Sequence, residues 1–371
     1  MEPQLSEVSL PARLAEPDED ISAEELALAA RNHGMPLEAL RHDRTPAGLH
    51  YLLVHYDIPY LDPETWRLAV TGQVGSPFEL SLAELRELPA RTVRVTMECA
   101  GNGRAQLRPR PVSQPWLVEA VGTADWTGVP LREVLERAGA DPDAAEVVCT
   151  GADHGVERGV EQDYQRGLPL GEALRDEVLL AYAMNGEPLP PQHGFPLRLV
   201  VPGWYGMAHV KWLREIEVVG TPFTGFQNAV AYRTRQSPED PGEPVTRIAP
   251  RALLVPPGFP DFQSRHRIVR PGPVELTGRA WSGRAPLARV EVSTDDGACW
   301  RDAEVEPAGA HPWAWRRWRA TWRAEPGRYV LSVRATDADG VQPVTQPWNR
   351  GGFANNAVHR VPVTCLPARN G

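Results

Sequence analysis

Short segments in which apolar and polar residues alternate recur between residues 66 and 220, separated by a few amphipathic stretches. The alternating segments, which predict β-strands, are residues 67–70, 92–97, 146–150, 197–201 and 215–219. The amphipathic stretches, which predict helices, are residues 81–87, 131–138 and 170–175. Because these helices are few and irregularly spaced, the pattern favours a mixed α+β domain over a doubly wound parallel sheet.

The pattern changes after residue 233. Prolines and acidic residues dominate residues 234–262, and we expect a linker there because proline neither continues a helix nor pairs readily within a sheet. Beyond it, strand-like alternation occupies residues 274–280, 288–293, 315–322, 328–336 and 359–364. About 110 residues of this kind, with turns between them, indicate an immunoglobulin-like β-sandwich.

The first 45 residues are acidic and favour helix. Ser22 stands three residues before Glu25 and ahead of an apolar run, which is a capping-box start for a short helix. We therefore expect an N-terminal arm over residues 1–45, a first domain over residues 46–240 and a second domain over residues 241–371.

Charge and hydropathy exclude several classes of function. The chain has 371 residues and a formal net charge of −9, with 48 acidic and 39 basic residues spread along it, so a nucleic-acid partner is not expected. No apolar run reaches the ~18 residues of a membrane span, and the start lacks a signal peptide or a twin-arginine leader. A cytoplasmic location without a membrane partner is the expectation. Among the basic residues, Lys211 is the only lysine.

The cysteines Cys99, Cys149, Cys299 and Cys365 lie far apart. No Cys-x-x-Cys pair and no His–Cys cluster at zinc spacing occurs, which disfavours a disulfide scaffold and structural zinc. We expect Cys149, Cys299 and Cys365 to be small packing residues.

Cys99 differs because it stands in the octet Met-Glu-Cys-Ala-Gly-Asn-Gly-Arg, residues 97–104, directly after a predicted strand. The two glycines allow the backbone to approach a ligand closely, and Arg104 can lower the pKa of the thiol. A thiolate is both a nucleophile and a soft metal ligand. On these residues alone, a functional thiolate and a tight structural turn both remain open.

This octet resembles the cysteine loop of the sulfite oxidase family of molybdenum enzymes. The resemblance continues in the same order through Pro115-Trp116, Ala124-Asp125-Trp126-Thr127-Gly128, residues 179–186, residues 193–198, Val210-Lys211-Trp212-Leu213, Ala280-Trp281-Ser282-Gly283, residues 292–297 and Trp348-Asn349. It implies a mixed α/β molybdopterin-binding domain followed by an immunoglobulin-like dimerisation domain, and hence a homodimer.

The resemblance also implies a cofactor, namely molybdenum held by one pyranopterin and by the sulfur of Cys99, with no haem. It assigns cofactor contacts to His55, Tyr56, Asp57, Asp153, His193, Arg198, Gly206, Met207, Ala208, His209, Val210 and Lys211. Cationic and histidine donors suit the anionic phosphate tail of a pterin. The sole lysine falls at the pterin-contacting lysine of the family, where a compact ammonium is not interchangeable with a guanidinium.

For the substrate pocket, Arg104, Trp116 and Tyr232 match the family pattern. His55 replaces one pocket arginine, a second aligns with a glycine, and Arg350 is the candidate replacement one residue upstream. A histidine with a reference pKa near ~6.5 is only partly charged at neutral pH, so a dianion would find less permanent charge here. A substrate less charged than sulfite is therefore the alternative.

The resemblance implies a molybdenum oxidoreductase that oxidises sulfite, or a related small oxo-acceptor, to sulfate. Its catalytic residues would be Cys99, Arg104, Tyr232, Trp116, His55 and Arg350. Electrons would pass to a separate acceptor such as a cytochrome c or a small oxidant. Two alternatives stay open: reduction of a sulfoxide or another oxo compound, and a non-catalytic protein whose sandwich binds a partner.

Overall fold

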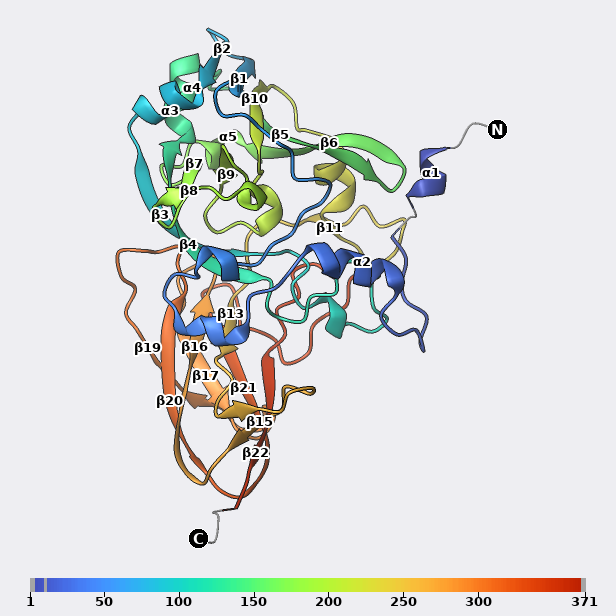
Figure 1. The fold of residues 1–371 in the computed structure, drawn as a ribbon, viewed down its shortest axis with the longest axis vertical. Helices are drawn as coiled ribbons and strands as arrows, with labels where there is room; N and C mark the ends of the chain where they lie inside the picture. The colour runs from blue at the N-terminus through green and yellow to red at the C-terminus, as the bar shows by residue number, and fades with distance from the viewer. Residues whose placement is uncertain (1–3, 10–11, 368–371) are drawn as a thin grey trace.

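The computed structural model describes residues 4–9 and 12–367 and contains two parts, one above the other in Figure 1. The upper part holds one mixed sheet, one antiparallel sheet and short helices, and the lower part is a β-sandwich near the C-terminal end of the chain. The expected α+β architecture with a second, all-β domain is confirmed. No helix among the described residues is long and apolar enough to cross a membrane.

The first sheet of the upper part has the order β2 (Phe78–Ser81), β1 (Arg67–Gly72), β10 (Leu213–Val219), β5 (Glu146–Glu157) and β6 (Val160–Pro169). Only the pairing of β1 with β10 is parallel in this sheet. The second sheet consists of β3 (Arg91–Glu98), β4 (Val121–Pro130), β7 (Leu179–Met184), β8 (Glu187–Pro188) and β9 (Arg198–Val200). Strands β2, β4, β6, β7 and β8 were not predicted, whereas β1, β3, β5, β9 and β10 agree with the alternation in the sequence.

Three short helices flank these sheets: α3 (Leu82–Glu87), α4 (Leu131–Ala138) and α5 (Leu170–Ala173). The side chain of Ser81 caps α3 together with Glu84, and Gly139 closes α4 at a φ of 65°, a conformation that glycine adopts without strain. Two 3₁₀ turns precede β1: η1 (Leu37–Arg41) and η2 (Ala47–Leu49). Three further 3₁₀ turns and one π turn lie between strands: η3 (Arg104–Gln106), η4 (Pro191–His193), η5 (Gly206–Ala208) and η6 (Gln227–Ala231).

The lower part is a sandwich of two sheets. One has the order β13 (Arg251–Leu254), β16 (Gly272–Trp281), β20 (Arg316–Ala324) and β19 (Glu304–Val305). The other has the order β14 (Phe259–Pro260), β15 (Arg267–Val269), β22 (His359–Cys365), β21 (Gly327–Thr336), β17 (Arg289–Ser293) and β18 (Arg301–Asp302). Inward-facing residues of both sheets, including Trp318, Trp322 and Val363, form its core.

The expected linker over residues 234–262 is partly wrong. This segment contributes β12 (Glu243–Pro244), which pairs with β11 (Arg233–Thr234), and it contributes β13 and β14 of the sandwich. Proline is tolerated because Pro250 and Pro256 flank β13 instead of interrupting it, and because β13 and β14 are edge strands.

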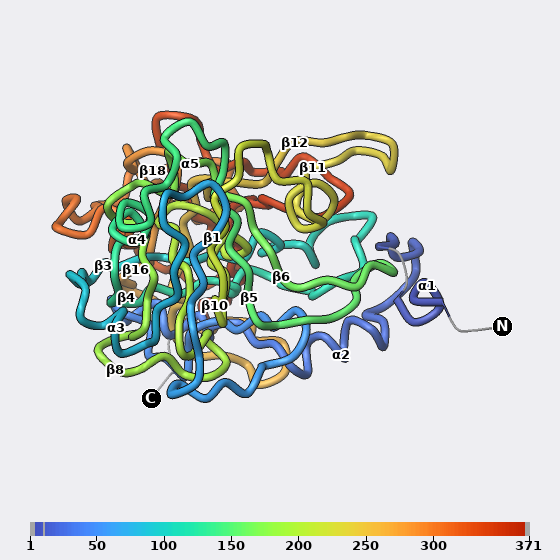
Figure 2. Tube along the Cα trace, turned by 90° about the horizontal axis from the view of Figure 1, so that it is seen from above, coloured from blue at the N-terminus to red at the C-terminus, as the bar shows by residue number. Residues whose placement is uncertain are grey.

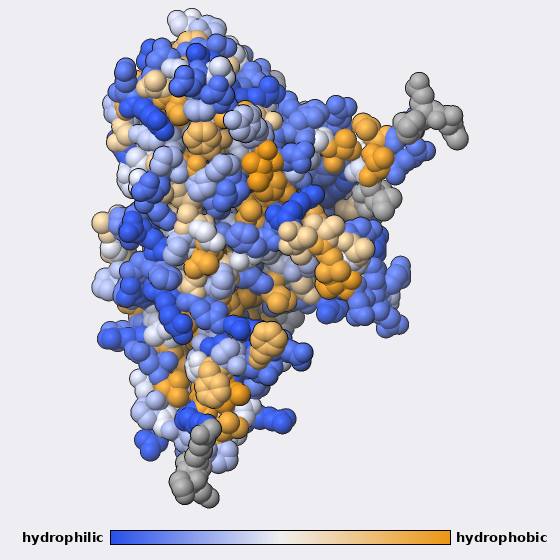
Figure 3. Space-filling model, in the orientation of Figure 1, coloured by the Kyte–Doolittle hydropathy of each residue, from blue (hydrophilic) through white to orange (hydrophobic). Residues whose placement is uncertain are grey.

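The N-terminal arm lies along the junction of the two parts, at the right in Figure 1. It holds α1 (Leu5–Val8) and α2 (Ala23–Arg31), and the predicted capping box between Ser22 and Glu25 is present. Figure 2 shows α1 beside the tip of the β5–β6 hairpin, where the Cα atom of Ser6 lies 3.4 Å from the Cβ position that a side chain would take at Gly159. Apolar side chains are exposed on both helices, as Figure 3 shows over this region.

One hydrophobic cluster crosses from the upper part into the sandwich. It joins residues of both upper sheets to Leu253, Trp281, Trp315 and Phe353.

Of the cysteines other than Cys99, Cys149 and Cys365 are buried as expected. Cys299 is exposed, so its assignment as a packing residue is wrong; it lies in a turn in which its N–H donates to Asp295 Oδ1 over 2.9 Å.

Candidate active site

Two adjoining cavities lie between the first domain, the arm and the sandwich loops. Leu53, His55, Cys99 and Tyr232 line both of them. The inner cavity is otherwise lined by His50, Tyr51, Leu52, Met97, Ala100, Asp153, Tyr164, His193, Arg198, Gly206, Met207, His209 and Lys211. The outer cavity continues toward the arm past Arg104, Trp116, Glu157, Arg350 and Phe353. Cys99 therefore stands where the two cavities meet.

The loop that carries Cys99 leaves the end of β3 and folds back on itself. The Cys99 N–H donates to Ala120 O over 2.9 Å, and the Asn102 N–H donates to Cys99 O over 3.0 Å. Gly103 has a φ of 93° and faces Asn355 so closely that a Cβ atom would lie 2.9 Å from its amide. The glycine predicted for close approach is thus needed to bring a sandwich residue against the cysteine loop.

Burial raises the pKa of the Cys99 thiol, and the Arg104 guanidinium only partly opposes this effect. Arg104 thus lowers the thiol pKa as expected, but the larger effect of burial, which the sequence does not reveal, leaves the pKa raised. A coordinating metal cation deprotonates a thiol outright, which burial alone does not. Among the described residues no three His, Cys, Asp and Glu side chains gather as a metal-binding cluster, so a metal here would take few protein ligands.

Two cations point into the inner cavity without a carboxylate partner. Arg198 is 6% exposed and its guanidinium donates to the carbonyl oxygens of His193, over 2.9 Å, and His209, over 3.3 Å. Lys211 Nζ donates to Leu53 O over 2.7 Å. Neither forms an ion pair with another residue in the described part of the chain, and Arg198 Nε is buried without a partner there. A buried cation without an ion pair, such as Arg198, is costly, and the half-buried Lys211 adds positive charge that Asp153 only partly offsets. This cavity is therefore a ready site for an anion.

Burial is the main cause of the pKa shifts in the inner cavity. Burial, with Arg198 adding to it, lowers the pKa of Lys211 to about 7. Burial lowers the pKa of His193 to about 2 and that of His209 to about 3, so both are neutral at pH 7. Burial raises the pKa of Asp153 to about 6, and its Oδ1 atom lacks a partner among the described residues.

His209 has a positioning role. Its Nδ1 atom accepts from the Val201 N–H over 3.2 Å, and its Nε2 atom lies 3.1 Å from Trp204 O. Both ring nitrogens are therefore engaged by backbone, which fixes the turn that leads to Lys211.

Like Gly103, Gly206 allows a close approach, since a Cβ atom there would lie 2.4 Å from the Tyr51 hydroxyl.

His55 and Tyr232 form a pair at the junction of the cavities. Their Nε2 and hydroxyl oxygen atoms are 2.8 Å apart. Burial lowers the pKa of His55 to about 3, with Lys211 and Arg31 adding to the shift, so the imidazole is neutral. The ring of His55 also lies 4.7 Å from that of Tyr164, measured between centroids. The sequence predicted a partial positive charge at His55, whereas the buried imidazole is uncharged.

Positive charge is instead supplied by arginines of the outer cavity. Arg104 is 6% exposed, and its Nε donates to Gly351 O over 2.9 Å while its Nη1 donates to Gln114 O over 3.3 Å. Arg31, Arg158 and Arg350 line the same cavity, and none of these four arginines pairs with a carboxylate in the described residues. In a chain of net charge −9, this is a localised basic site.

The structure brings most predicted site residues together. Those that line a cavity are Cys99, Arg104, Tyr232, Trp116, His55, Arg350, Tyr56, Asp153, His193, Arg198, Gly206, Met207, His209 and Lys211. Ala208 and Val210 are buried in the hydrophobic core, and Asp57 is exposed; none of these three lines either cavity.

Sequence reasoning missed His50, Tyr51 and Tyr164 of the inner cavity and Arg31 of the outer one. His50 and Tyr51 precede His55 by only a few residues, which is weak sequence evidence that they belong to the site. Tyr164 lies within β6 and Arg31 at the end of α2, and no local pattern marks either as a site residue.

These residues fit a pyranopterin with a phosphate tail. The unpaired Arg198 and Lys211 suit the phosphate, the unpartnered Asp153 oxygen and neutral His193 suit ring donors and acceptors, and the Cys99 sulfur faces the same cavity. Two family models indicate the same class of cofactor. The oxidoreductase molybdopterin binding domain matches residues 55–227, and the Mo-co oxidoreductase dimerisation domain matches residues 261–365. Fold and site together define a molybdopterin-binding oxidoreductase.

Individual relatives narrow this class. The chain is 36% identical over 343 residues to mitochondrial sulfite oxidase of Mus musculus, covering 87% of this chain and 62% of that protein. It is 34% identical over 350 residues to sulfite oxidase of Arabidopsis thaliana, covering 85% of this chain and 87% of that protein. Among solved structures, sulfane dehydrogenase SoxCD from Paracoccus pantotrophus is similar with a TM-score of 0.78 and 26% identity, covering 98% of this chain and 92% of that one.

The chain belongs to the sulfite oxidase family of molybdenum enzymes. It spans less than two thirds of the length of the mouse, rat and human relatives that it matches.

Proposed function

We propose that this protein oxidises a small sulfur oxoanion, with sulfite as the leading substrate, at a molybdenum–pyranopterin centre whose protein ligand is Cys99. The observation that carries the proposal is the position of Cys99 between a cationic inner cavity and an arginine-lined outer cavity. The first matches the needs of an anionic cofactor, and the second those of an anionic substrate.

In the inner cavity, Arg198 and Lys211 would bind the phosphate, while Asp153 and His193 would hold the pterin rings. Bound there, molybdenum and its pterin supply oxygen-atom transfer coupled to a two-electron change. The chain contributes binding and orientation: Gly206 leaves room beside the Tyr51 hydroxyl, and His209 fixes the turn before Lys211.

In the outer cavity, Arg104 would bind the substrate anion and stabilise charge that develops during transfer. Its two carbonyl contacts hold the guanidinium in place before substrate arrives. Tyr232, oriented by its 2.8 Å contact with His55, would donate a hydrogen bond at the reacting oxygen. Trp116, only 3% exposed, would exclude water from the same side.

A less charged sulfur compound is the second candidate substrate. It is favoured by the neutral state of His55, because this position then supplies no charge to bind a dianion. The similar solved structure is named a sulfane dehydrogenase, which is a further reason to include sulfane sulfur among the compounds tested.

The remaining partners follow from the family. The second domain matches a dimerisation model, and we propose a homodimer through it. The electrons would leave singly to a separate acceptor, such as a cytochrome c or a small oxidant.

The proposal is tested on protein purified from a host that makes the pterin cofactor. Molybdenum and pterin should each be present at about one per chain, and sulfite should reduce ferricyanide or cytochrome c. A parallel assay with reduced dye and a sulfoxide tests the reverse reaction. Absence of both molybdenum and pterin, or turnover of the sulfoxide without turnover of any sulfur oxoanion or sulfane, would contradict the proposal.

A further inference from the structure

The N-terminal arm lies outside both matched family models, the first of which begins at residue 55, yet it forms a wall of the outer cavity. Val8 from α1, and Glu24, Leu28 and Arg31 from α2, line this cavity together with Cys99 and Arg104. A segment with no part in the matched domains thus faces the same space as the cysteine.

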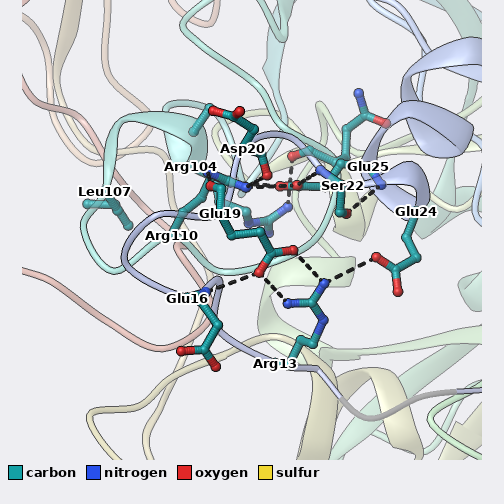
Figure 4. A network of polar contacts seen from close by, with 12 residues as sticks. Arg13, Glu16, Glu19, Asp20, Ser22, Glu24, Glu25, Arg104, Leu107 and Arg110 are labelled. Atoms are coloured by element: carbon teal, nitrogen blue, oxygen red, sulfur yellow. Dashed lines mark hydrogen bonds and ion pairs between the residues drawn. The ribbon is translucent and has the colours of Figure 1, made fainter.

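A buried ion pair attaches the arm to the first domain. Glu25 is 0% exposed, and its carboxylate accepts from Arg110 Nε over 2.9 Å and from Arg110 Nη2 over 3.0 Å. Arg110 also donates to the carbonyl oxygens of Glu19 and Asp20, at 3.3 and 2.8 Å. Figure 4 shows this network, in which the carboxylate of Glu25 lies between its helix cap and the guanidinium. Buried bidentate pairs of this kind fix geometry on both sides.

The residue held by this pair lies in the loop that carries the substrate-binding side chains. Arg110 stands between Arg104 and Trp116, and its backbone carbonyl accepts from the Ala15 N–H over 2.8 Å. Two residues on, the Val112 N–H donates to Arg13 O over 2.9 Å. The arm therefore runs beside this loop and is joined to it by an isolated antiparallel bridge between Leu14 and Pro111.

A second connection reaches Arg104 more directly. Asn32, which follows α2, donates from Nδ2 to Gln114 Oε1 over 3.0 Å, and the carbonyl of Gln114 accepts from Arg104 Nη1 over 3.3 Å. The Asn32 Oδ1 atom accepts from the Val54 N–H over 2.7 Å, directly before His55. Arg31 donates to His55 O over 3.3 Å and adds an exposed positive charge at the mouth.

We propose that the N-terminal arm completes the anion-binding site: Glu25, through Arg110, positions the loop carrying Arg104 and Trp116, and Arg31 adds charge that attracts the anion. The inference rests on the proposed function for the sulfur oxoanion as ligand and for the roles of Arg104 and Trp116. Glu25 is a positioning residue in this scheme because it acts through Arg110.

The test measures sulfate binding by isothermal titration calorimetry, together with sulfite KM and kcat, on the cofactor-loaded full-length protein. Glu25→Gln removes the buried charge while keeping the shape of the side chain. Glu16→Gln is the matched control, because Glu16 is exposed on the same arm and its carboxylate forms no hydrogen bond or ion pair among the described residues. Arg31→Gln is a second variant, which alters an exposed residue and should fold normally.

The proposal expects Glu25→Gln to weaken sulfate binding and raise KM by about tenfold through displacement of Arg104, with kcat much less affected. Arg31→Gln should raise the sulfate Kd and the sulfite KM by about threefold and reduce the dependence of both on ionic strength. Glu16→Gln should match the parent. Circular dichroism at the assay temperature verifies that each variant is folded.

A Glu25→Gln protein that unfolds at a lower temperature but keeps the parental sulfate Kd and sulfite KM would overturn the proposal. Failure of the parent protein to bind sulfate would also overturn it. Arm-dependent sulfate binding without sulfite turnover would support this inference while contradicting the proposed function. Sulfite turnover with a KM that none of the three substitutions changes would support the proposed function while contradicting this inference.

Discussion

Arg251 of the sandwich donates a 2.7 Å hydrogen bond to Glu98, the residue directly before Cys99, and the two side chains are only 1% and 2% exposed. The other Glu98 oxygen accepts from Trp281 Nε1 over 2.8 Å. Asn355 of the sandwich donates to Gly103 O over 2.7 Å on the far side of the cysteine. The second domain thus holds both ends of the loop that carries the proposed metal ligand.

This relationship predicts a large effect of Arg251→Leu on stability. Removing one partner leaves the Glu98 carboxylate buried and unpaired, which should lower the free energy of unfolding by about 3–5 kcal/mol. Chemical denaturation measures the change. Arg319→Gln is the control, since its pair with Glu304 is exposed and should be worth about 0–1 kcal/mol. Equal effects of the two substitutions would contradict the buried-pair argument.

Cys99→Ser should abolish sulfite oxidation. A serine hydroxyl is a poor substitute for a soft thiolate ligand, so activity should fall by about a thousandfold or more. Sulfite-dependent dye reduction and metal analysis on the same sample report activity and molybdenum content separately. Cys299→Ser, at an exposed turn of the sandwich, is the matched control and should behave as the parent. Full activity of Cys99→Ser would exclude Cys99 as the ligand.

The neutral state of His55 predicts how anion binding depends on pH. With the His55 pKa lowered to about 3 by burial, no charge change at this residue occurs between pH 5.5 and 8. The sulfate Kd of His55→Gln should therefore follow the same pH profile as that of the parent. His55→Arg, which restores a permanent charge, should tighten sulfate binding by about tenfold. An inflection near pH 6.5 that disappears in His55→Gln would show that the histidine titrates.

Buried neutral histidines predict a loss of stability on acidification. Burial lowers the pKa of His359 in the sandwich to about 3, while the unfolded residue takes up a proton near pH ~6.5. Because the unfolded state then binds more protons, stability falls as pH drops below that value, approaching about 1.4 kcal/mol per pH unit for each such group. Denaturation curves at pH 6 and 5 measure the slope.

His359→Gln should reduce this slope, because one proton fewer is then taken up on unfolding. His154→Gln is the control because Asp163 and Glu161 raise the pKa of the exposed His154, so both native and unfolded states are protonated below pH 6. Its substitution should leave the slope between pH 6 and 5 unchanged. An unchanged slope in His359→Gln would mean that this residue is already charged in the native protein.

Alternation along the chain was sufficient to predict strands such as β1 and β16, because one face of each is buried and the other is not. It failed for β4, buried along nearly its whole length, since a strand covered on both faces has no alternation to detect. It also failed for β13, where flanking prolines suggested a linker although the strand between them is entirely apolar apart from Arg251.

The candidate site was predictable where a local motif marks it, as at Cys99 and Arg104. What the sequence could not provide are relations between distant segments. Nothing near Glu25 indicates that its carboxylate meets Arg110 across 85 positions, and nothing near His55 indicates that burial removes its charge. Both depend on tertiary packing, which no window of sequence contains.

Lys211 gives the cofactor cavity a unique chemical label. As the only lysine, it carries the single ε-amine of the protein, and its pKa of about 7 leaves much of that amine unprotonated, and hence nucleophilic, at neutral pH. An acylating reagent would therefore modify one side chain, half-buried at the cavity wall, and would do so more slowly once an anion occupied the cavity. The extent of acylation at Lys211, read from a peptide digest that separates it from the N-terminal amine, then reports the fraction of molecules whose inner cavity is empty.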